Sequence, residues 1–382
     1  MNKILNFFED KIPNCKCYKT YKFCFDTKEY PTSDYNDHKD FKVRKSGETE
    51  KHDSYISLEK RMKSEITSLF RFFLDGSRRT YKVDDIAIGN RVFPIIAGQI
   101  GVGCCERVDK DTFKPIKLEN GLVVSIPECS DKDGSDKYFF NNLLMKLNEL
   151  SFLKQKNLEF KKILTYRDSK TYENDQYENL AIAKIQDEMI QQEKEVVKSL
   201  VREKLINQDS YLLKDGSLEY SEKGVEDKSF RLSLIKSNYQ HVVGVSKSFN
   251  PELCDDGKTK SMAKKIAELP LYSRTPAFLL EPNIIQDVKF CVWYVRIRDI
   301  KRTISPFDGI VKIEKILIKD NEMRNGLESE DVDMISANIC NERNPVAYGS
   351  DKRWANHLYP VFLTESYIKS KYLSDIYYLN LF

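Results

Sequence analysis

The chain has 382 residues, of which 41% are hydrophobic and 32% are charged. This balance excludes a wholly disordered protein and is enough for a substantial core beneath a charged surface. With 62 basic and 59 acidic residues the formal net charge is +3, which does not by itself predict a nucleic-acid partner. No apolar run reaches the roughly 18 residues of a membrane span, and the N-terminus lacks the pattern of a signal peptide.

The nine cysteines lie mostly in apolar segments, which is typical of reduced thiols in a cytoplasmic protein. Their one cluster is Cys15-x-Cys17 together with Cys24. Because this cluster lacks a matching second pair of ligands, we interpret it as part of an N-terminal lobe rather than as a zinc site.

Residues 1–55 are predicted to form an N-terminal extension, because 25–55 is rich in charged and turn-forming residues. Residues 56–382 are predicted to form one elaborated α/β domain. After a helix around 58–69, three apolar segments bounded by Gly, Pro or charge predict a meander of strands. These segments are RFFLDGS from Arg71, FPIIAGQIGVGCC from Phe93 and GLVVSIP from Gly121.

The remainder of the chain alternates predicted helices and strands. A helical insertion is expected at about 138–207, and it contains the longest helix candidate, 172–207, whose apolar residues keep helical spacing. The later predicted elements are strands at 211–218 and 241–249, a short helix at 260–269, a pair of β-branched and aromatic strands at 290–300 and 309–318, and helices near 329–343 and 364–379. This order predicts a mixed α/β fold around one central sheet.

The phrase Asp-Gly-Ser occurs three times. Asp75 and Asp215 each follow an apolar segment, whereas Asp133 does not and is interpreted as an ordinary turn. A turn is also the alternative interpretation for the first two. Carboxylates at the ends of buried strands are partly desolvated and repel one another, and a divalent cation removes both penalties. We therefore predict that Asp75 and Asp215 bind Mg²⁺ or Mn²⁺, two ions of which can drive phosphodiester hydrolysis.

The long helix is predicted to supply a third acid. Glu193 lies beside the apolar stripe of this helix and is the preferred candidate. Glu178 falls within the stripe and is the alternative, while Glu188 lies further away. An acid on an apolar stripe needs a partner, which a metal ion or a salt bridge would supply.

Several motifs occur in the order found in the NurA nuclease family: FLDGSRR, the helical glutamate, YLLKDGSL, HVVGVSK, WYVRIR and HLYPVFLTE. Over about residues 60–375 the chain resembles this family. The resemblance implies an RNase H-like (Piwi-like) mixed sheet flanked by helices and a DNA nuclease dependent on Mn²⁺ or Mg²⁺. It also implies a homodimer docked on a hexameric HerA-type ATPase, acting in DNA end processing or anti-phage defence.

The resemblance also assigns roles to residues. It implies that Asp75 bridges both metal ions, that Asp215 and Glu193 are the other acids, and that Lys247 contacts phosphate. The last motif departs from the family, many members of which place a histidine shortly after the Tyr-Pro pair. Here Glu365 stands in that region and is predicted as a fourth metal ligand, with His357 as the alternative.

Further basic residues are candidates for binding DNA. Arg78 and Arg79 follow Asp75 and suit phosphate recognition, although a solvated strand end is the alternative. Tyr294 and Arg296 alternate along a strand and are predicted as a platform for single-stranded DNA, with sheet packing as the alternative.

Two other functions compete with a DNA nuclease. One is a non-catalytic DNA-binding or adaptor subunit that caps an ATPase ring, and the other is a nuclease that acts on RNA or on guide-bound targets. The sequence has no GxxxxGK[ST] loop, so the chain is not predicted to be the ATPase itself.

Overall fold

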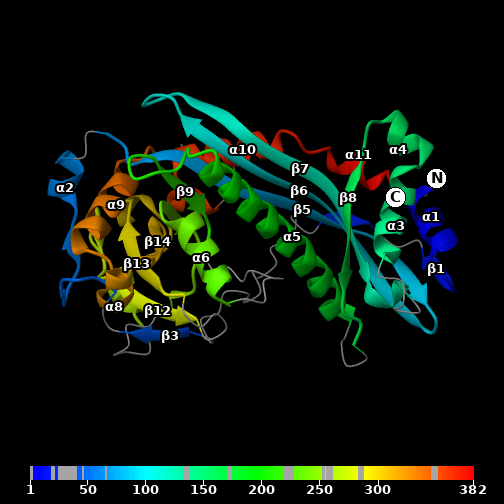
Figure 1. Ribbon diagram of the computed structural model, residues 1–382, viewed down its shortest axis with the longest axis horizontal. Helices are drawn as coiled ribbons and strands as arrows, with labels where there is room; N and C mark the ends of the chain where they lie inside the picture. The colour runs from blue at the N-terminus through cyan, green and yellow to red at the C-terminus, as the bar shows by residue number, and fades with distance from the viewer. Residues whose placement is uncertain are drawn as a thin grey trace.

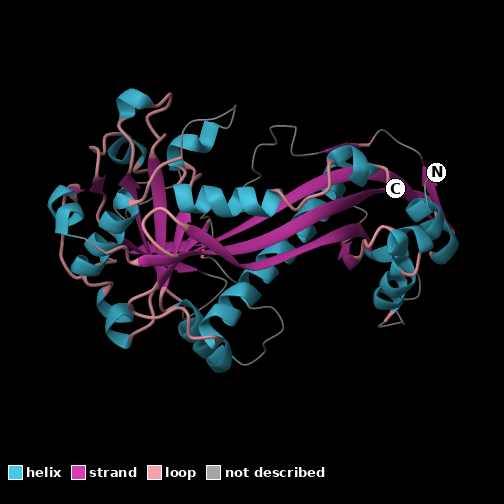
Figure 2. Ribbon diagram, turned by 90° about the horizontal axis from the view of Figure 1, so that it is seen from above, coloured by secondary structure: helices cyan, strands magenta, loops and turns pink. Residues whose placement is uncertain are grey.

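The computed structural model places helices on both faces of one large sheet (Figures 1 and 2). It describes residues 3–18, 22–24, 41–44, 47–64, 67–131, 138–169, 174–218, 228–251, 254, 261–282, 288–345 and 352–382. The strands are β1 (Cys15–Tyr18), β2 (Phe23–Cys24), β3 (Phe41–Arg44), β4 (Ile56–Ser57), β5 (Phe70–Ile88), β6 (Arg91–Arg107), β7 (Phe113–Pro127), β8 (Phe160–Tyr166), β9 (Tyr211–Asp215), β10 (Val242–Ser246), β11 (Ser273–Arg274), β12 (Phe278–Pro282), β13 (Phe290–Arg296) and β14 (Ile310–Ile316). The helices are α1 (Lys3–Lys11), α2 (Glu59–Ser64), α3 (Phe139–Asn148), α4 (Ser151–Gln155), α5 (Asn174–Arg202), α6 (Lys228–Tyr239), α7 (Ala263–Ala267), α8 (Asp320–Asn325), α9 (Ser329–Asn341), α10 (Tyr359–Lys369) and α11 (Asp375–Leu379).

The sheet is mixed, and its strand order is β3-β12-β13-β14-β10-β9-β5-β6-β7-β8. Strands β5, β6 and β7 form the antiparallel meander predicted from the sequence. After α5 the chain adds β9 parallel to β5, and after α6 it adds β10 parallel to β9. The predicted strand pair is also present, as antiparallel β13 and β14. The mixed α/β class, with a large sheet flanked by helices, is therefore confirmed.

The meander strands are long, and they connect two ends of the molecule (Figure 1). At one end they join the sheet of β9, β10, β13 and β14, and at the other they meet α1, α3, α4 and α11, close to both termini. Parts of residues 1–55 also enter the sheet, since β1 and β2 pair with β5, and β3 pairs with β12. Cys15 and Cys17 lie on β1, and Cys24 lies on β2.

Two helices cover opposite faces of the meander. A Cβ placed on Gly98 of β6 would lie 3.1 Å from Ile185 of α5, whereas a Cβ on Gly103 would lie 2.8 Å from Ile368 of α10. Residues an odd number apart on a strand point to opposite faces, so α5 and α10 sandwich β6. These two helix-covered surfaces are called the α5 face and the α10 face below.

Several predicted boundaries were wrong. The strand carrying Asp75 does not end there but continues to Ile88, because β6 pairs with it along most of its length. Strand β8 was missed, and it pairs in parallel with β7 inside the region expected to be helical. The helix predicted at 364–379 is two helices, α10 and α11. The first of them begins earlier, at Tyr359, with Pro360 in its first turn, where a proline costs no hydrogen bond. Asp133 lies outside the described residues.

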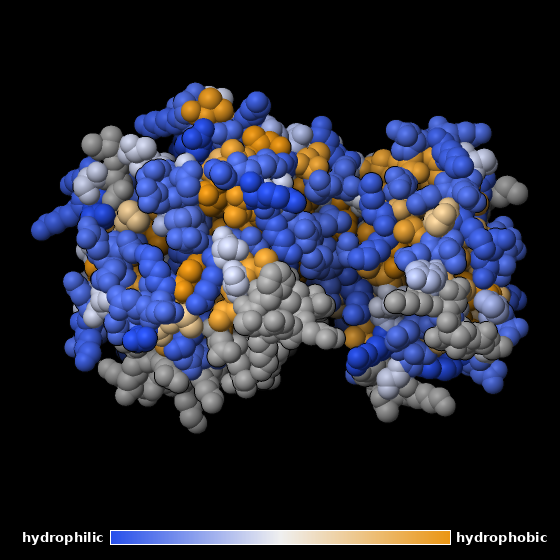
Figure 3. Space-filling view, in the orientation of Figure 1, coloured by the Kyte–Doolittle hydropathy of each residue, from blue (hydrophilic) through white to orange (hydrophobic). Residues whose placement is uncertain are grey.

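Charged and polar side chains cover most of the face seen in Figure 3, with apolar side chains in scattered patches between them. In the described part of the chain, no helix combines the length and the apolar character that crossing a membrane requires.

Candidate active site

Asp75 lies in the interior of the sheet rather than at a turn. It pairs with Gly103 across β5 and β6, so both residues point to the α10 face. The Asp75 side chain is 4% exposed, and none of the described residues hydrogen-bonds or ion-pairs with its carboxylate. Burial, and next the negative charge of Asp215, raise the pKa of Asp75 well above its usual value. A buried carboxyl of this kind needs either a proton or a cation.

Asp215 is the last residue of β9, where the strand does end as predicted. Gly216 follows with a φ of +84°, a conformation that glycine adopts without steric cost. The Ser217 hydroxyl and the Leu218 N–H both donate to Glu314 Oε2, each over 2.7 Å. Glu314, on β14, is itself 1% exposed and pairs with Lys312. It fixes the turn that follows Asp215, a role that the sequence analysis missed.

Lys247, directly after β10, lies at the centre of the cluster. Its Nζ atom is 2.8 Å from Asp215 Oδ2, 2.8 Å from His357 Nε2 and 3.7 Å from Glu365 Oε2. Burial disfavours its charge, but Asp215, Asp75 and Glu365 outweigh burial and raise the pKa of Lys247. The ammonium group therefore stays charged and neutralises part of the acidic cluster.

Glu365 reaches the cluster from α10, about 290 residues away from Asp75 in the chain. Its Oε2 atom lies 2.8 Å from His357 Nε2, and its Oε1 atom accepts a hydrogen bond of 2.6 Å from Lys369. Burial opposes its ionisation, but the hydrogen bond from His357 and the charges of Lys247 and Lys369 hold the pKa of Glu365 well below its usual range. Both C-terminal candidates, Glu365 and His357, are thus part of one cluster.

Glu193 lies on the other face of the sheet. Its carboxylate packs against Gly76, where any side chain would clash with it, and Gly76 points to the α5 face because it neighbours Asp75. Glu193 is 3% exposed and pairs with Lys214 at 2.9 Å. Burial raises the pKa of Glu193 and Lys214 opposes that shift. Glu193 is therefore separated by the sheet from the cluster that contains Asp75, Asp215 and Glu365.

The alternative helical acids are remote from this cluster. Glu178 accepts a hydrogen bond of 2.8 Å from Lys82, and Glu188 pairs with Lys162 at 2.7 Å. Of the three candidates on α5, only Glu193 lies against Gly76 of β5 and Lys214 of β9. Lys214 was missed in the sequence, although its position directly before Asp215 on an apolar strand was a signal.

Two of the predicted DNA-binding residues, Tyr294 and Arg296, are buried in the fold. Arg296 is 1% exposed and donates to four backbone carbonyls, those of Leu269, Ala267, Pro306 and Asp308, so the predicted phosphate contact is not supported. Tyr294 is buried beside it, because both faces of β13 are covered. The packing alternative holds for this pair.

Arg78 and Arg79 are partly exposed on β5. Arg78 Nε donates to Gln186 over 2.5 Å, and Arg79 Nη1 lies 2.9 Å from Asp375. Both guanidinium groups are therefore engaged by neighbouring side chains. Arg79 also stacks over the Tyr372 ring, with 5.7 Å between the guanidinium carbon and the ring centre.

The donor chemistry of the cluster fits a divalent metal ion. Asp75, Asp215 and Glu365 present carboxylate oxygens, which Mg²⁺ and Mn²⁺ prefer, and Asp75 has no other partner among the described residues. In the same part of the chain, however, no three His, Cys, Asp or Glu side chains already form a metal-binding group. Lys247 holds the space beside Asp215, so this side chain has to move aside before a metal ion reaches that carboxylate.

Comparisons with known proteins give a distant likeness. No known protein family has a profile that matches the chain, and no curated protein matches it in sequence. Among solved structures, the chain is similar to the crystal structure of the NurA nuclease from Sulfolobus solfataricus. The TM-score is 0.38 and the sequence identity 10%, over 81% of this chain and 86% of that chain. The nuclease activity is that of the Sulfolobus protein.

Proposed function

We propose that this chain is a nuclease that hydrolyses phosphodiester bonds in DNA and depends on Mn²⁺ or Mg²⁺. The observation that carries the proposal is Asp75, a buried carboxylate without a partner among the described residues, beside Asp215 and Glu365 on one face of the sheet. Purely structural carboxylates are paired or hydrogen-bonded when they are buried. Three carboxylates around a single lysine instead suit a site that binds cations and phosphate.

In this proposal Asp75, Asp215 and Glu365 hold the metal ions. Bound metal ions would lower the pKa of a water nucleophile and neutralise charge on the scissile phosphate. Lys247 is already charged beside these acids, and it binds a non-bridging phosphate oxygen once it leaves Asp215. His357 and Lys369 orient the two oxygens of Glu365.

Glu193 acts as a positioning residue in the same proposal. It pairs with Lys214, whose Nζ atom also donates to the backbone carbonyl of Asp215 over 2.7 Å. The pair therefore holds the end of β9 from the α5 face. This role differs from the direct metal contact that the sequence predicted for Glu193.

Membership of the NurA family, a homodimer, docking on a hexameric HerA-type ATPase, a cytoplasmic location and a role in end processing or anti-phage defence belong to the same proposal. They are supported by the order of the motifs between residues 60 and 375. The fold adds that Asp75 and Asp215 come from neighbouring strands, β5 and β9.

The proposal is tested by cleavage of end-labelled single- and double-stranded DNA with Mn²⁺. We expect the Asp75→Ala and Asp215→Ala variants to lose more than about 100-fold in rate, because mutations of residues that only support metal ligands cost 10–100-fold. Glu188→Gln is the matched control, since Glu188 lies on α5 but pairs with Lys162 away from the cluster. Undiminished cleavage by folded Asp75→Ala protein would refute the assignment.

A second function is favoured by the two lysines. Because Lys247 and Lys214 already neutralise acids of the site, a non-catalytic DNA-binding or adaptor subunit is the competing proposal. It predicts no cleavage with any divalent ion and no rise in melting temperature when Mn²⁺ is added.

Labelled RNA in the same assay tests the third function, because cleavage of RNA but not of DNA would select a nuclease for RNA.

A further inference from the structure

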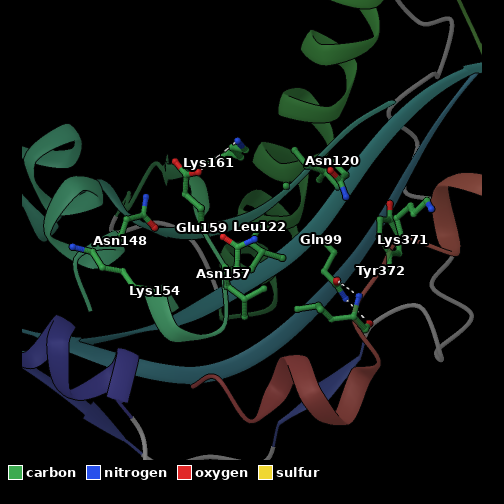
Figure 4. Close-up of a pocket in the computed structure, with 14 residues that line it drawn as sticks. Gln99, Asn120, Leu122, Asn148, Lys154, Asn157, Glu159, Lys161, Lys371 and Tyr372 are labelled. Atoms are coloured by element: carbon green, nitrogen blue, oxygen red, sulfur yellow. Dashed lines mark hydrogen bonds and ion pairs between the residues drawn. The ribbon is translucent and has the colours of Figure 1, made fainter. Parts of the chain in front are cut away.

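A polar cavity of about 610 Å³ lies between the meander strands and the residues that follow α10 (Figure 4). Its walls come from β6 and β7, from the end of α3 through α4 to the start of β8, and from the residues that follow α10. The side chains that matter are Lys154, Lys161, Lys371, Glu159, Asn120 and Tyr372. The volume lies within the usual range of about 300–1,000 Å³ for small-molecule sites, but the wall is hydrophilic rather than apolar.

The charge of the cavity wall is positive. Three lysines, Lys154, Lys161 and Lys371, face one acid, Glu159, which gives 3 − 1 = +2. Lys161 lies 3.8 Å from Glu159, whereas among the described residues no carboxylate lies within ion-pair distance of Lys154 or Lys371. All three lysines are exposed. A hydrophilic anion is the ligand that such a wall recognises.

Part of the cavity wall lies on the same face of the sheet as the acids. Gln99 of the cavity wall lies four residues before Gly103, the partner of Asp75, so both point to the α10 face. Four residues of a strand span about 13 Å. Tyr372 links the cavity to the strand that carries Asp75. It lines the cavity and donates a hydrogen bond of 2.7 Å to the carbonyl of Ser77, two residues after Asp75 on β5.

We propose that the cavity binds backbone phosphates of the DNA strand that is cut at the acidic cluster, a proposal that rests on the proposed function. Lys154 and Lys371 form the ion pairs, and Asn120 supplies a neutral hydrogen-bonding group at the edge of β7. Because α10 and Tyr372 cover the sheet between Gly103 and Gln99, the DNA strand passes over the outside of α10, with one part at the acids and another part in the cavity. Binding at two places on one strand also explains how a nearly neutral protein grips a polyanion.

The experiment measures binding of a labelled 20-nucleotide single strand in EDTA, where nothing is cut, at several salt concentrations. The test variant is Lys154→Ala/Lys371→Ala, and the control is Lys60→Ala/Lys264→Ala, which changes two exposed lysines on α2 and α7 outside the cavity. We expect the test variant to bind about 10-fold more weakly. Its plot of log affinity against log salt should be less steep by roughly 1.4, because two phosphate contacts at 0.7 each are lost.

Three outcomes overturn the proposal. One is a test variant that binds DNA with the wild-type affinity and salt slope, and another is an equal loss in the control variant. The third is lysine-dependent binding of thymidine monophosphate without any change for the 20-nucleotide strand, which would make the cavity a site for a free nucleotide. Cleavage with Mn²⁺ is measured in parallel. If the wild type cuts DNA and the test variant binds normally, the cavity proposal fails alone; if the wild type neither binds nor cuts DNA, both proposals fail.

Discussion

Asp75 and Glu48 are both buried carboxylates, with 4% and 2% of their surface exposed, but their surroundings differ completely. Glu48 accepts two hydrogen bonds from the Arg274 guanidinium, of 3.0 and 2.8 Å, and a third of 2.7 Å from the Ala277 N–H. Asp75 has no such partner among the described residues and lies beside two other acids. A buried carboxylate with a full set of hydrogen-bond partners supports the fold, whereas one without such partners is available to a ligand.

The largest effect expected from this comparison concerns Glu48. Replacing it by alanine leaves the Arg274 guanidinium, which is fully buried, with Asp333 as its one acidic partner among the described residues. We expect Glu48→Ala to lower the free energy of unfolding by about 3–5 kcal/mol, the usual cost of breaking a buried ion pair. Urea denaturation measures the change. Asp333→Ala is the control, because Asp333 is 33% exposed and its loss should cost about 1 kcal/mol or less. Equal losses in the two variants would contradict the distinction.

Lys315 extends the comparison to a buried cation. Its Nζ atom donates to the carbonyls of Tyr239 and Gln240 at the end of α6, and no carboxylate in the described part of the chain forms an ion pair with it. Burial lowers the pKa of Lys315 to about 8. The unfolded chain therefore holds this proton to higher pH than the folded protein does, so the free energy of unfolding rises between pH 8 and about 10.5.

This rise should amount to about 2 kcal/mol between pH 7.5 and 9.5 and should be absent in Lys315→Met. Urea denaturation at the two pH values measures it. Lys319→Met, which changes a side chain that is 68% exposed, serves as the control and should keep the rise. The same pH dependence in wild type and Lys315→Met would show that another group causes it.

The smallest expected effect concerns the contribution of Asp75 to the stability of the protein. Because its pKa is raised in the folded protein, the unfolded chain releases this proton first as the pH increases. The contribution of Asp75 to wild-type stability in EDTA therefore falls above about pH 4, the pKa of an unperturbed aspartate. Asn does not ionise, so Asp75→Asn should be more stable at pH 7 by about 1 kcal/mol, the lower end of the cost of an unsatisfied buried polar group.

Thermal unfolding in EDTA at pH 4.5 and pH 7 tests this expectation. The advantage of Asp75→Asn should shrink at the lower pH, and added Mn²⁺ should stabilise only the wild type. A variant less stable than the wild type at pH 7 in EDTA would mean that the Asp75 carboxylate has a structural partner after all.

Local patterns in the sequence predicted much of the fold. Apolar segments bounded by glycine, proline or charge marked the three meander strands and the later strand pair, because such runs are buried in sheets. The same reasoning missed β8, whose sequence FKKILTY carries two lysines next to its apolar residues and lies between helices. It also placed Asp75 at a strand end, since a single strand does not reveal how far its partner continues.

The acids themselves were identifiable by residue type and context, but their neighbours were not. Lys247 follows a different strand from Asp215, and they meet because β10 pairs in parallel with β9. Glu365 lies on α10, and no periodic pattern in the sequence predicts that it approaches Asp75. The face of the sheet on which each acid lies depends on strand pairing and helix packing. Both were invisible in the sequence, and they place Glu193 on the α5 face, opposite Asp75.

The sequence by itself determined which groups carry charge, which segments are apolar and the order in which they follow one another. These are properties of residues and of short segments, and they are the same in any arrangement of the chain. Only the tertiary structure decided that Asp75 has no partner among the described residues, that Lys247 lies among the acids and that three lysines from distant segments line one cavity. Those features depend on distances between segments far apart in the chain, which strand pairing and helix packing set.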